Sequence, residues 1–288
     1  MTMMRWNRGR VGNETVNLTV GLTEAELRAA APSIFAVEAH ESRSERFRPI
    51  PTFEVIRALE NEGFAVVGAR QSLTRDPGKA DFTKHLLRLR RLGDEALTRN
   101  GTAFEILLKN ANDGTSAYDL MAGFWRFICG NGLMVGDKLS DVKVRHSGDV
   151  ATKVVEGTFE VLDQSQRLLE APERFSDVRL SADEQMAFAN AAHVLRFGEP
   201  EAEKPQPIAA EQLLKVRRPE DVQSDLWTVF NRVQENAIRG GLNGQRVNED
   251  TGQVRRVTSR PIKGIDQDVK LNRALWFLTE QMAQLKNG

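Results

Sequence analysis

Basic side chains at alternating positions could form a surface that holds phosphate groups. If residues 82–92 are extended, Lys84, Arg88 and Arg90 share one face and Leu87 and Leu89 share the other. A guanidinium group can bind phosphate oxygens through two parallel hydrogen bonds. This pattern predicts a groove for a polyanion, and a solvated strand or helix face remains the alternative. The expected groove residues are Arg43, Arg46, Arg48, Lys84, Arg88, Arg90 and Arg91, and Arg126 either joins them or is a buried structural arginine.

A second basic cluster lies in a long polar stretch, residues 242–264, between two apolar helical patterns. Asp250-Thr251-Gly252 is typical of a hairpin tip, because such residues tolerate the backbone of a tight turn. A basic arm of this kind can reach along nucleic acid or bind a neighbouring subunit. The alternative is an exposed loop whose charge serves solubility. The cationic residues of the arm are Arg246, Arg255, Arg256, Arg260 and Lys263.

Carboxylates offer a different chemistry. Asp141-Val142-Lys143 has the Asp-x-Lys spacing of many metal-dependent nucleases, and Asp119 is the earlier acidic residue that such a site would need. Two carboxylates would hold Mg²⁺, and Lys143 would activate water or stabilise the transition state. The tripeptide also arises by chance, so a nuclease stays an alternative.

Other cofactor chemistry is not expected. Four dispersed histidines and one cysteine do not form a zinc-ligand pattern. That cysteine, Cys129, stands among apolar residues without a nearby histidine, which favours a buried structural role over a nucleophile. Residues 130–136 only approach G-x-G-x-x-G, and a Walker-type loop is absent from the sequence, so a nucleotide-driven enzyme is not expected.

Composition sets the broad class. The chain has 288 residues, of which 40% are hydrophobic and 28% charged, so it can bury a core. Lys+Arg and Asp+Glu both number 40, which excludes a uniformly basic nucleic-acid binder but not a local basic patch. Residues 43–91 carry a net charge of +5, residues 156–203 of −7 and residues 239–273 of +4. With a single cysteine, no long apolar run and no leader-like pattern, we expect a cytoplasmic protein without a membrane segment.

Hydrophobic periodicity predicts an α+β fold, with a small, mostly antiparallel sheet and helices followed by a helical C-terminal half. Residues 64–72 and 103–110 are typical of strands, and the turn at 112–114 brings residues 118–129 back beside the second of them. Thr52 is expected to cap a helix that Gly63 ends, and Ser181 with Glu184 to form a capping box. Residues 82–92 fit either a strand or a helix.

The same patterns divide the chain into five segments. These are an N-terminal arm (1–42), an α+β core (43–148), a helical segment (149–197), a loop or linker (198–210) and a helical C-terminal region with a basic hairpin-like loop (211–288). The long C-terminal helices could supply the interface of a homo-oligomer.

Four motifs resemble a known family. They are KNANDGTSA at residues 109–117, RFICGNGL at 126–133, LWTVFNRVQEN at 226–236 and LNRALW at 271–276. The first two are similar to the signature of a phage- and plasmid-borne family, number 932 among the domains of unknown function, and the others to its prophage branch. The resemblance covers nearly the whole chain and implies a mobile-element origin, but it carries no catalytic residues. A weaker architectural similarity is to Rad-type single-strand annealing proteins.

These features favour a binding protein over an enzyme, because no titratable constellation demands a particular reaction. We expect ATP-independent binding of single-stranded DNA that promotes annealing or recombination for a mobile element, with the backbone in the basic groove and the bases outward. The alternatives are the Mg²⁺-dependent nuclease and a protein-binding module that acts against a host defence factor.

Overall fold

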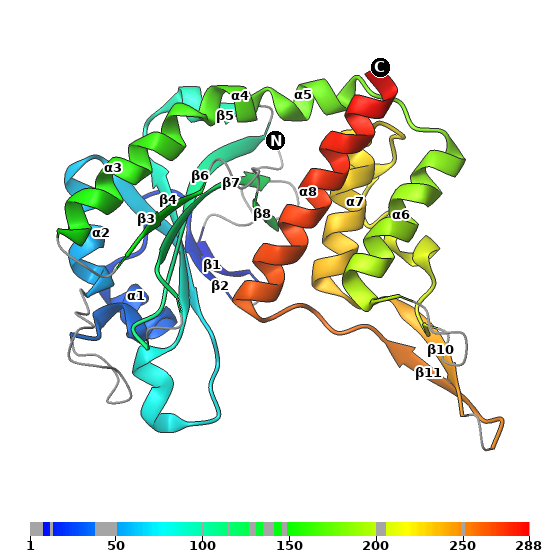
Figure 1. The fold of residues 1–288 in the computed structure, drawn as a ribbon, viewed down its shortest axis with the longest axis horizontal. Helices are drawn as coiled ribbons and strands as arrows, with labels where there is room; N and C mark the ends of the chain where they lie inside the picture. Colours follow the sequence, from blue (N-terminus) through cyan, green and yellow to red (C-terminus); the bar gives the residue numbers. More distant parts are fainter. Residues whose placement is uncertain are drawn as a thin grey trace. The chain divides into compact units, whose positions relative to one another are not determined.

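The computed structural model describes residues 8–11, 14–37, 51–99, 101–113, 116–126, 131–134, 141–145, 149–199, 206–248 and 251–287. The chain forms two compact units, Met1–Leu169 (unit 1) and Glu170–Gly288 (unit 2) (Figure 1). The boundary falls inside the helical segment expected at 149–197, because α3 (Val150–Asp163) packs on the sheet of unit 1.

Unit 1 is built on one sheet, in which the described residues contribute nine strands and every pairing is antiparallel. The strand order is β1-β2-β3-β4-β6-β7-β8, with β5 beside β6 and β9 beside β7. The strands are β1 (Arg8–Val11), β2 (Glu14–Asn17), β3 (Phe64–Gln71), β4 (His85–Arg91), β5 (Thr98–Arg99), β6 (Thr102–Asn110), β7 (Tyr118–Arg126), β8 (Asn131–Met134) and β9 (Val142–Val144). The expected mostly antiparallel α+β fold is confirmed.

One face of this sheet is apolar and is covered by α2 (Thr52–Asn61) and α3 (Figure 1). Phe104, Ile106 and Leu108 alternate along β6 toward this face, as the sequence pattern predicts. Phe64 on β3 meets Phe159 on α3 edge to face at 6.0 Å. The remaining short elements of unit 1 are α1 (Glu24–Ala30), η1 (Pro32–Phe35), η2 (Pro77–Phe82), η3 (Glu95–Leu97) and α4 (Ser165–Leu169).

Two local expectations for unit 1 need correction. Residues 8–37, expected as an arm, hold β1, β2, α1 and η1, and Val16 of β2 pairs with Gly68 of β3. Four-residue strands are too short to show an alternating pattern. The N-cap of α2 is Pro51 rather than Thr52, whose hydroxyl instead joins a buried hydrogen-bond network.

Unit 2 is helical, as expected for the C-terminal half, and carries one two-stranded sheet. Its central helix, α7 (Leu226–Arg239), is buried continuously from residue 226 to 237. Ser181 and Glu184 form the predicted capping box at the start of α6 (Ala182–Phe197). The other elements are α5 (Ala171–Ser176), η5 (Ala210–Leu214), η6 (Pro219–Asp221), β10 (Asn243–Val247), β11 (Val254–Thr258) and α8 (Ile265–Asn287). Of the helices described, none combines the length and the apolar character that crossing a membrane requires.

Candidate nucleic-acid interface

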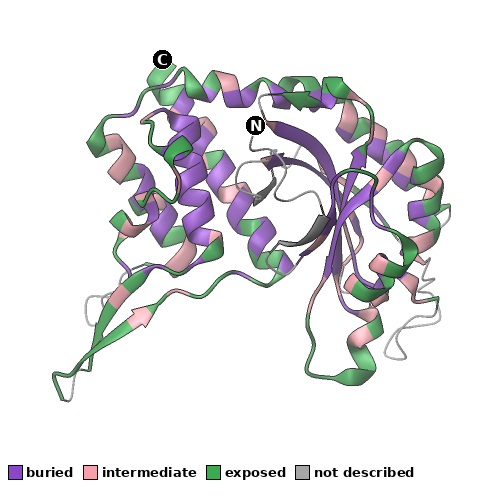
Figure 2. Ribbon diagram, turned by 180° about the vertical axis from the view of Figure 1, so that it is seen from behind, coloured by how far each residue is buried: buried purple, intermediate pink, exposed green. Residues whose placement is uncertain are grey.

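The β10–β11 hairpin of unit 2 carries exposed arginines and projects away from the helices of that unit (Figures 1 and 2). The register places Arg246 directly opposite Arg255, and Gln245 directly opposite Arg256. Because neighbouring residues of a strand face opposite sides, the Arg246–Arg255 pair lies on one face of the ribbon and Arg256 on the other. All three arginines are exposed, as are Arg260 and Lys263 beyond the hairpin.

Backbone hydrogen bonds fix the base of this hairpin. Leu242 is buried, and its carbonyl accepts a hydrogen bond from the backbone N–H of Ser259 at 2.8 Å. Gly240, at φ +65°, ends α7 where any Cβ would meet backbone atoms of Ser259 and Arg260 at 2.7 Å. Gly244 lies even closer to the carbonyl oxygen of Pro207, which a Cβ would meet at 1.8 Å. The hairpin is therefore anchored tightly at its base, while its strands stay exposed.

Within the described residues, the arginines of the hairpin have no charge partner that would explain them as structural residues. Across the residues described, no carboxylate forms an ion pair with Arg246, Arg255 or Arg256. Like charges directly opposite each other in a two-stranded ribbon destabilise it. The two facing guanidinium groups therefore repel each other in the isolated hairpin, and an anion bound between them would remove this repulsion.

The basic strand of unit 1 has a different environment from the one expected. Residues 85–91 do form a strand, β4, and Arg88 and Arg90 share a face. They are only 2% and 8% exposed, however, and both donate to Glu105 on β6. Arg88 also donates to Glu14 on β2 at 3.1 Å, and its guanidinium lies 3.6 Å from the ring centroid of Trp125. The structure places these arginines in a buried ion-pair network rather than on an exposed groove.

Electrostatics favour the charged form of this network. Burial alone would lower the pKa of Arg88, but the charges of Glu105 and Glu14 outweigh it and raise that pKa. Burial would likewise raise the pKa of Glu105, and the charges of Arg88 and Arg90 lower it below its ordinary value of 4.5. The groups are thus held as ions that neutralise each other.

The other expected groove residues that the structure describes do not form one surface with Arg88 and Arg90. Arg91 is exposed but alternates with Arg90, so it lies toward the opposite face of the sheet. Lys84 precedes β4 and is half-buried, and Arg126 ends β7 opposite Thr102. Arg43, Arg46 and Arg48, as well as Cys129, lie outside the described residues.

The strand pairing brings the expected nuclease residues close together. Asp119 on β7 lies directly opposite Lys143 on β9, and Asp141 immediately precedes that strand. On its other side, however, Asp119 forms an ion pair with Lys109 of β6 at 2.9 Å. The side chains of this pair are 15% and 13% exposed, so Lys109 already neutralises the carboxylate that would bind Mg²⁺. Within the described ranges, no group of three His, Cys, Asp or Glu residues could hold a metal ion.

The sequence did not indicate a second arrangement, a buried hydrogen-bond network on the helix-covered face of the sheet. His85 of β4 bridges two segments: Nδ1 lies 2.9 Å from the Ser33 hydroxyl in η1, and Nε2 lies 3.0 Å from the Thr52 hydroxyl in α2. Asn110 donates to the Thr52 hydroxyl at 3.0 Å. Each of these side chains is completely buried. Their only signal in the sequence is the presence of polar residues within apolar stretches.

Asn112 of the KNANDGTSA motif and Tyr118, which directly follows the motif, complete this network. Asn112 donates to the backbone carbonyl of Ser33 at 2.8 Å, and the Tyr118 hydroxyl lies 3.2 Å from that of Thr52. Burial raises the pKa of Tyr118. The hydrogen bond with Thr52 lowers this pKa and the negative charge of Glu54 raises it, and the net shift is upward. Tyr118 is therefore a neutral hydrogen-bonding group. The motif serves to hold η1 and the start of α2 against the sheet.

Comparisons with known proteins agree with this reading of the sequence motifs. A family model described as "Domain of unknown function (DUF932)" matches residues 39–276. The chain is 44% identical over 261 residues to UPF0380 protein YafZ of Escherichia coli strain K12, and 43% identical over 261 residues to UPF0380 protein YfjQ of the same strain. Each alignment covers 91% of both chains. No solved structure matches, and the likeness to Rad-type annealing proteins finds no support. The chain is therefore a member of the family described as "Domain of unknown function (DUF932)".

Proposed function

We propose that this protein binds single-stranded DNA through the β10–β11 hairpin and thereby promotes annealing of complementary strands without nucleotide hydrolysis. The observation that carries the proposal is the exposed pair of facing arginines, Arg246 and Arg255. Phosphate groups would relieve their mutual repulsion, and each guanidinium could bind phosphate oxygens through paired hydrogen bonds.

The hairpin suits the backbone better than the bases. It carries arginines on both faces, and none of its described residues is aromatic. Contacts of this kind neutralise phosphates and are independent of sequence. A strand held by its phosphates would keep its bases free to pair with a complementary strand.

The salt dependence of binding gives a quantitative test. If Arg246, Arg255, Arg256, Arg260 and Lys263 each neutralise one phosphate, log K should fall against log salt with a slope of about −3.5. The double variant Arg246→Ala/Arg255→Ala should bind more weakly and reduce the magnitude of that slope by about 1.4. The measurement is fluorescence anisotropy of a labelled oligonucleotide at several salt concentrations.

Two control variants separate charge at the hairpin from charge in general. Arg246→Lys/Arg255→Lys keeps both charges and should keep the slope, with some loss of affinity because lysine cannot bind phosphate through a planar fork. Arg75→Ala/Lys153→Ala removes two exposed charges of unit 1 and should leave affinity and slope unchanged. Equal slopes for the wild type and the hairpin alanine variant would contradict the proposal.

The same preparation tests the alternatives. Duplex DNA and RNA of equal length show whether the ligand is single-stranded DNA, since a two-stranded ribbon also fits the major groove of a duplex. An annealing assay with two complementary labelled strands tests the second half of the proposal, and light scattering tests self-association.

Metal-dependent cleavage abolished by Asp141→Ala would indicate the nuclease instead. Absence of any binding at low salt would direct attention to a protein partner.

A further inference from the structure

Two phenylalanines and two arginines form a continuous stack on the surface of unit 1. The rings of Phe35 in η1 and Phe53 in α2 lie 4.7 Å apart between centroids, tilted by 38°. The guanidinium carbon of Arg28 lies 3.8 Å from the Phe35 centroid, and that of Arg57 lies 4.7 Å from the Phe53 centroid. The sequence gives no sign of this stack, because its members come from α1, η1 and α2.

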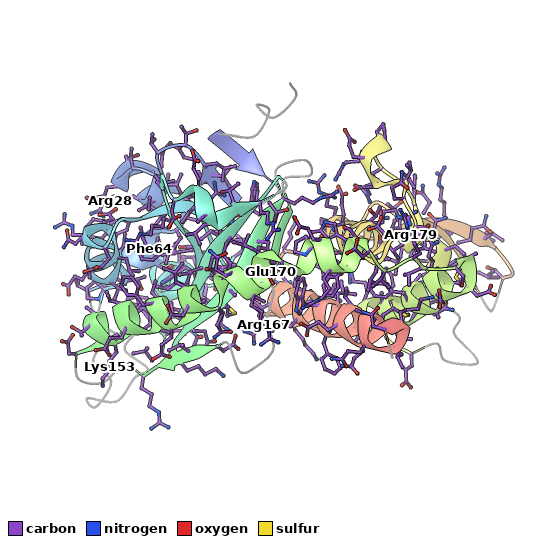
Figure 3. All side chains as sticks on the ribbon, turned by 90° about the horizontal axis from the view of Figure 1, so that it is seen from above. Arg28, Phe64, Lys153, Arg167, Glu170 and Arg179 are labelled. Carbon is purple, nitrogen blue, oxygen red and sulfur yellow. The ribbon has the colours of Figure 1, made fainter. Side chains whose placement is uncertain are left out.

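The two arginines form the accessible ends of this Arg–Phe–Phe–Arg stack. The side chain of Arg28 is 57% exposed and lies near the margin of unit 1 in Figure 3. It shares an ion pair with Glu24 at 2.7 Å, which leaves part of the guanidinium plane free. Arg57 is exposed and forms no ion pair within the described part of the chain.

The buried network described above holds the stack in place. Ser33 lies two residues before Phe35, and Thr52 lies immediately before Phe53. His85 binds the hydroxyl groups of both, so one buried side chain fixes the spacing of the two aromatic residues. Such a fixed surface loses little conformational entropy when it binds a flat ligand.

We propose that the Arg–Phe–Phe–Arg stack is a second contact for single-stranded nucleic acid, on which unpaired bases stack against the outer guanidinium planes. Bases in single strands stack on both aromatic rings and arginine guanidinium groups. The two positive charges also attract the phosphates that flank a stacked base. This inference rests on the proposed function and deepens it, because the stack would contact the bases of the nucleic acid, whereas the hairpin would contact its phosphates.

An oligonucleotide with abasic sites tests the stack, because it keeps the phosphates and lacks the bases. Wild-type protein should bind a natural oligonucleotide at least about fivefold more tightly than an abasic one of equal length. In Arg57→Lys, which keeps the charge but loses the planar group, this preference should shrink. Phe53→Leu interrupts the stack and should also reduce the preference for the natural oligonucleotide over the abasic one.

Arg174 offers a control, because its guanidinium carbon also lies over a ring, 5.1 Å from the centroid of Phe175, but Phe175 is fully buried and packs against the buried Trp276 instead of an exposed ring. Arg174→Ala should keep the full preference for the natural oligonucleotide. Thermal unfolding of each variant shows whether it is folded under the binding conditions, and Arg57→Lys, at an exposed site, keeps the test valid if Phe53→Leu unfolds.

The outcomes distinguish this inference from the proposed function. Equal binding of natural and abasic oligonucleotides by the wild type, with the predicted loss in the hairpin variant, overturns the stack alone. A preference for bases that depends on Arg57, together with a hairpin variant that binds normally, supports the stack and overturns the hairpin. Failure of the wild type to bind either oligonucleotide overturns both.

Discussion

Glu105 accepts hydrogen bonds from Arg88 through both of its carboxylate oxygens, at 2.6 and 2.7 Å, and from Arg90 at 2.5 Å. The three residues lie on adjacent strands of one sheet face and are nearly or fully buried. Charged groups are buried in proteins when they neutralise each other in this way. Arg88 and Arg90 therefore serve the stability of unit 1, whereas the arginines of the hairpin in unit 2 are exposed to solvent.

Replacing Arg88 should separate stability from binding. Arg88→Met leaves Glu105 and Glu14 buried with fewer partners, which should lower the free energy of unfolding by about 3–5 kcal/mol. Oligonucleotide affinity, measured where the variant remains folded, should equal that of the wild type. Chemical denaturation and anisotropy check the two parts, and a specific loss of affinity in the folded variant would return Arg88 to the binding surface.

Acid should weaken the same network. Because the pKa of Glu105 is lowered in the folded chain, its ion pairs contribute stability above about pH 4.5, and this contribution is lost as the pH falls toward the folded-state pKa. Glu105→Gln should be less stable at neutral pH and show a shallower loss of stability in acid. Denaturation midpoints between pH 3 and 7 measure this effect. The exposed Glu156→Gln should follow the wild-type curve.

The Thr52 hydroxyl should matter far more than an ordinary buried hydroxyl. Thr52→Val keeps the shape but leaves His85, Asn110 and Tyr118 without a shared partner, which should cost about 1–3 kcal/mol. In Thr158→Val, the lost hydroxyl donates only to the backbone carbonyl of Val154, and the cost should be about 0.5–1 kcal/mol. Equal denaturation midpoints for the two variants would show that the network contributes little.

The base of the hairpin should tolerate no added side chain at Gly244. A Cβ there would overlap the Pro207 carbonyl oxygen, so Gly244→Ala should shift the backbone and destabilise unit 2 by about 1–3 kcal/mol. It should also weaken oligonucleotide binding, because the arginine pair would be displaced. Gly264→Ala is the control, since its Cβ would meet only that of Gln267, at 3.8 Å. A Gly244→Ala variant as stable as this control would contradict the proposed anchoring.

Periodicity in the sequence predicted the elements whose faces differ in polarity. Phe104, Ile106 and Leu108 gave the strand β6, and Ser181 with Glu184 gave the start of α6. Alternation could not show that Arg88 and Arg90 are buried, because their partner Glu105 lies on another strand and looks like an ordinary exposed carboxylate. Whether an ion pair is buried depends on which strands pair in the folded sheet, and the local alternation of polar and apolar residues does not contain that information.

The two candidate sites, the hairpin and the Arg–Phe–Phe–Arg stack, also differ in how far the sequence predicts them. The hairpin cations lie within one short segment, so Arg255 and its neighbours could be found from the sequence, although their register could not. The stack of Phe35 and Phe53 joins residues from separate elements, and its rings do not repeat at any regular spacing. Only the folded arrangement of η1 and α2 brings these rings together.

The contact between Glu14 and Arg88 also has a consequence for synthesis of the chain. The two residues are 74 positions apart, and Glu105, which completes their network, follows later still. A growing chain therefore exposes Glu14 and the apolar residue Val16 long before β4 and β6 leave the ribosome. Contacts of such long sequence separation form slowly, and their delayed formation leaves strand edges open to wrong pairing. We expect the N-terminal strands to join the sheet late, and a nascent chain released before residue 126 to be prone to aggregation.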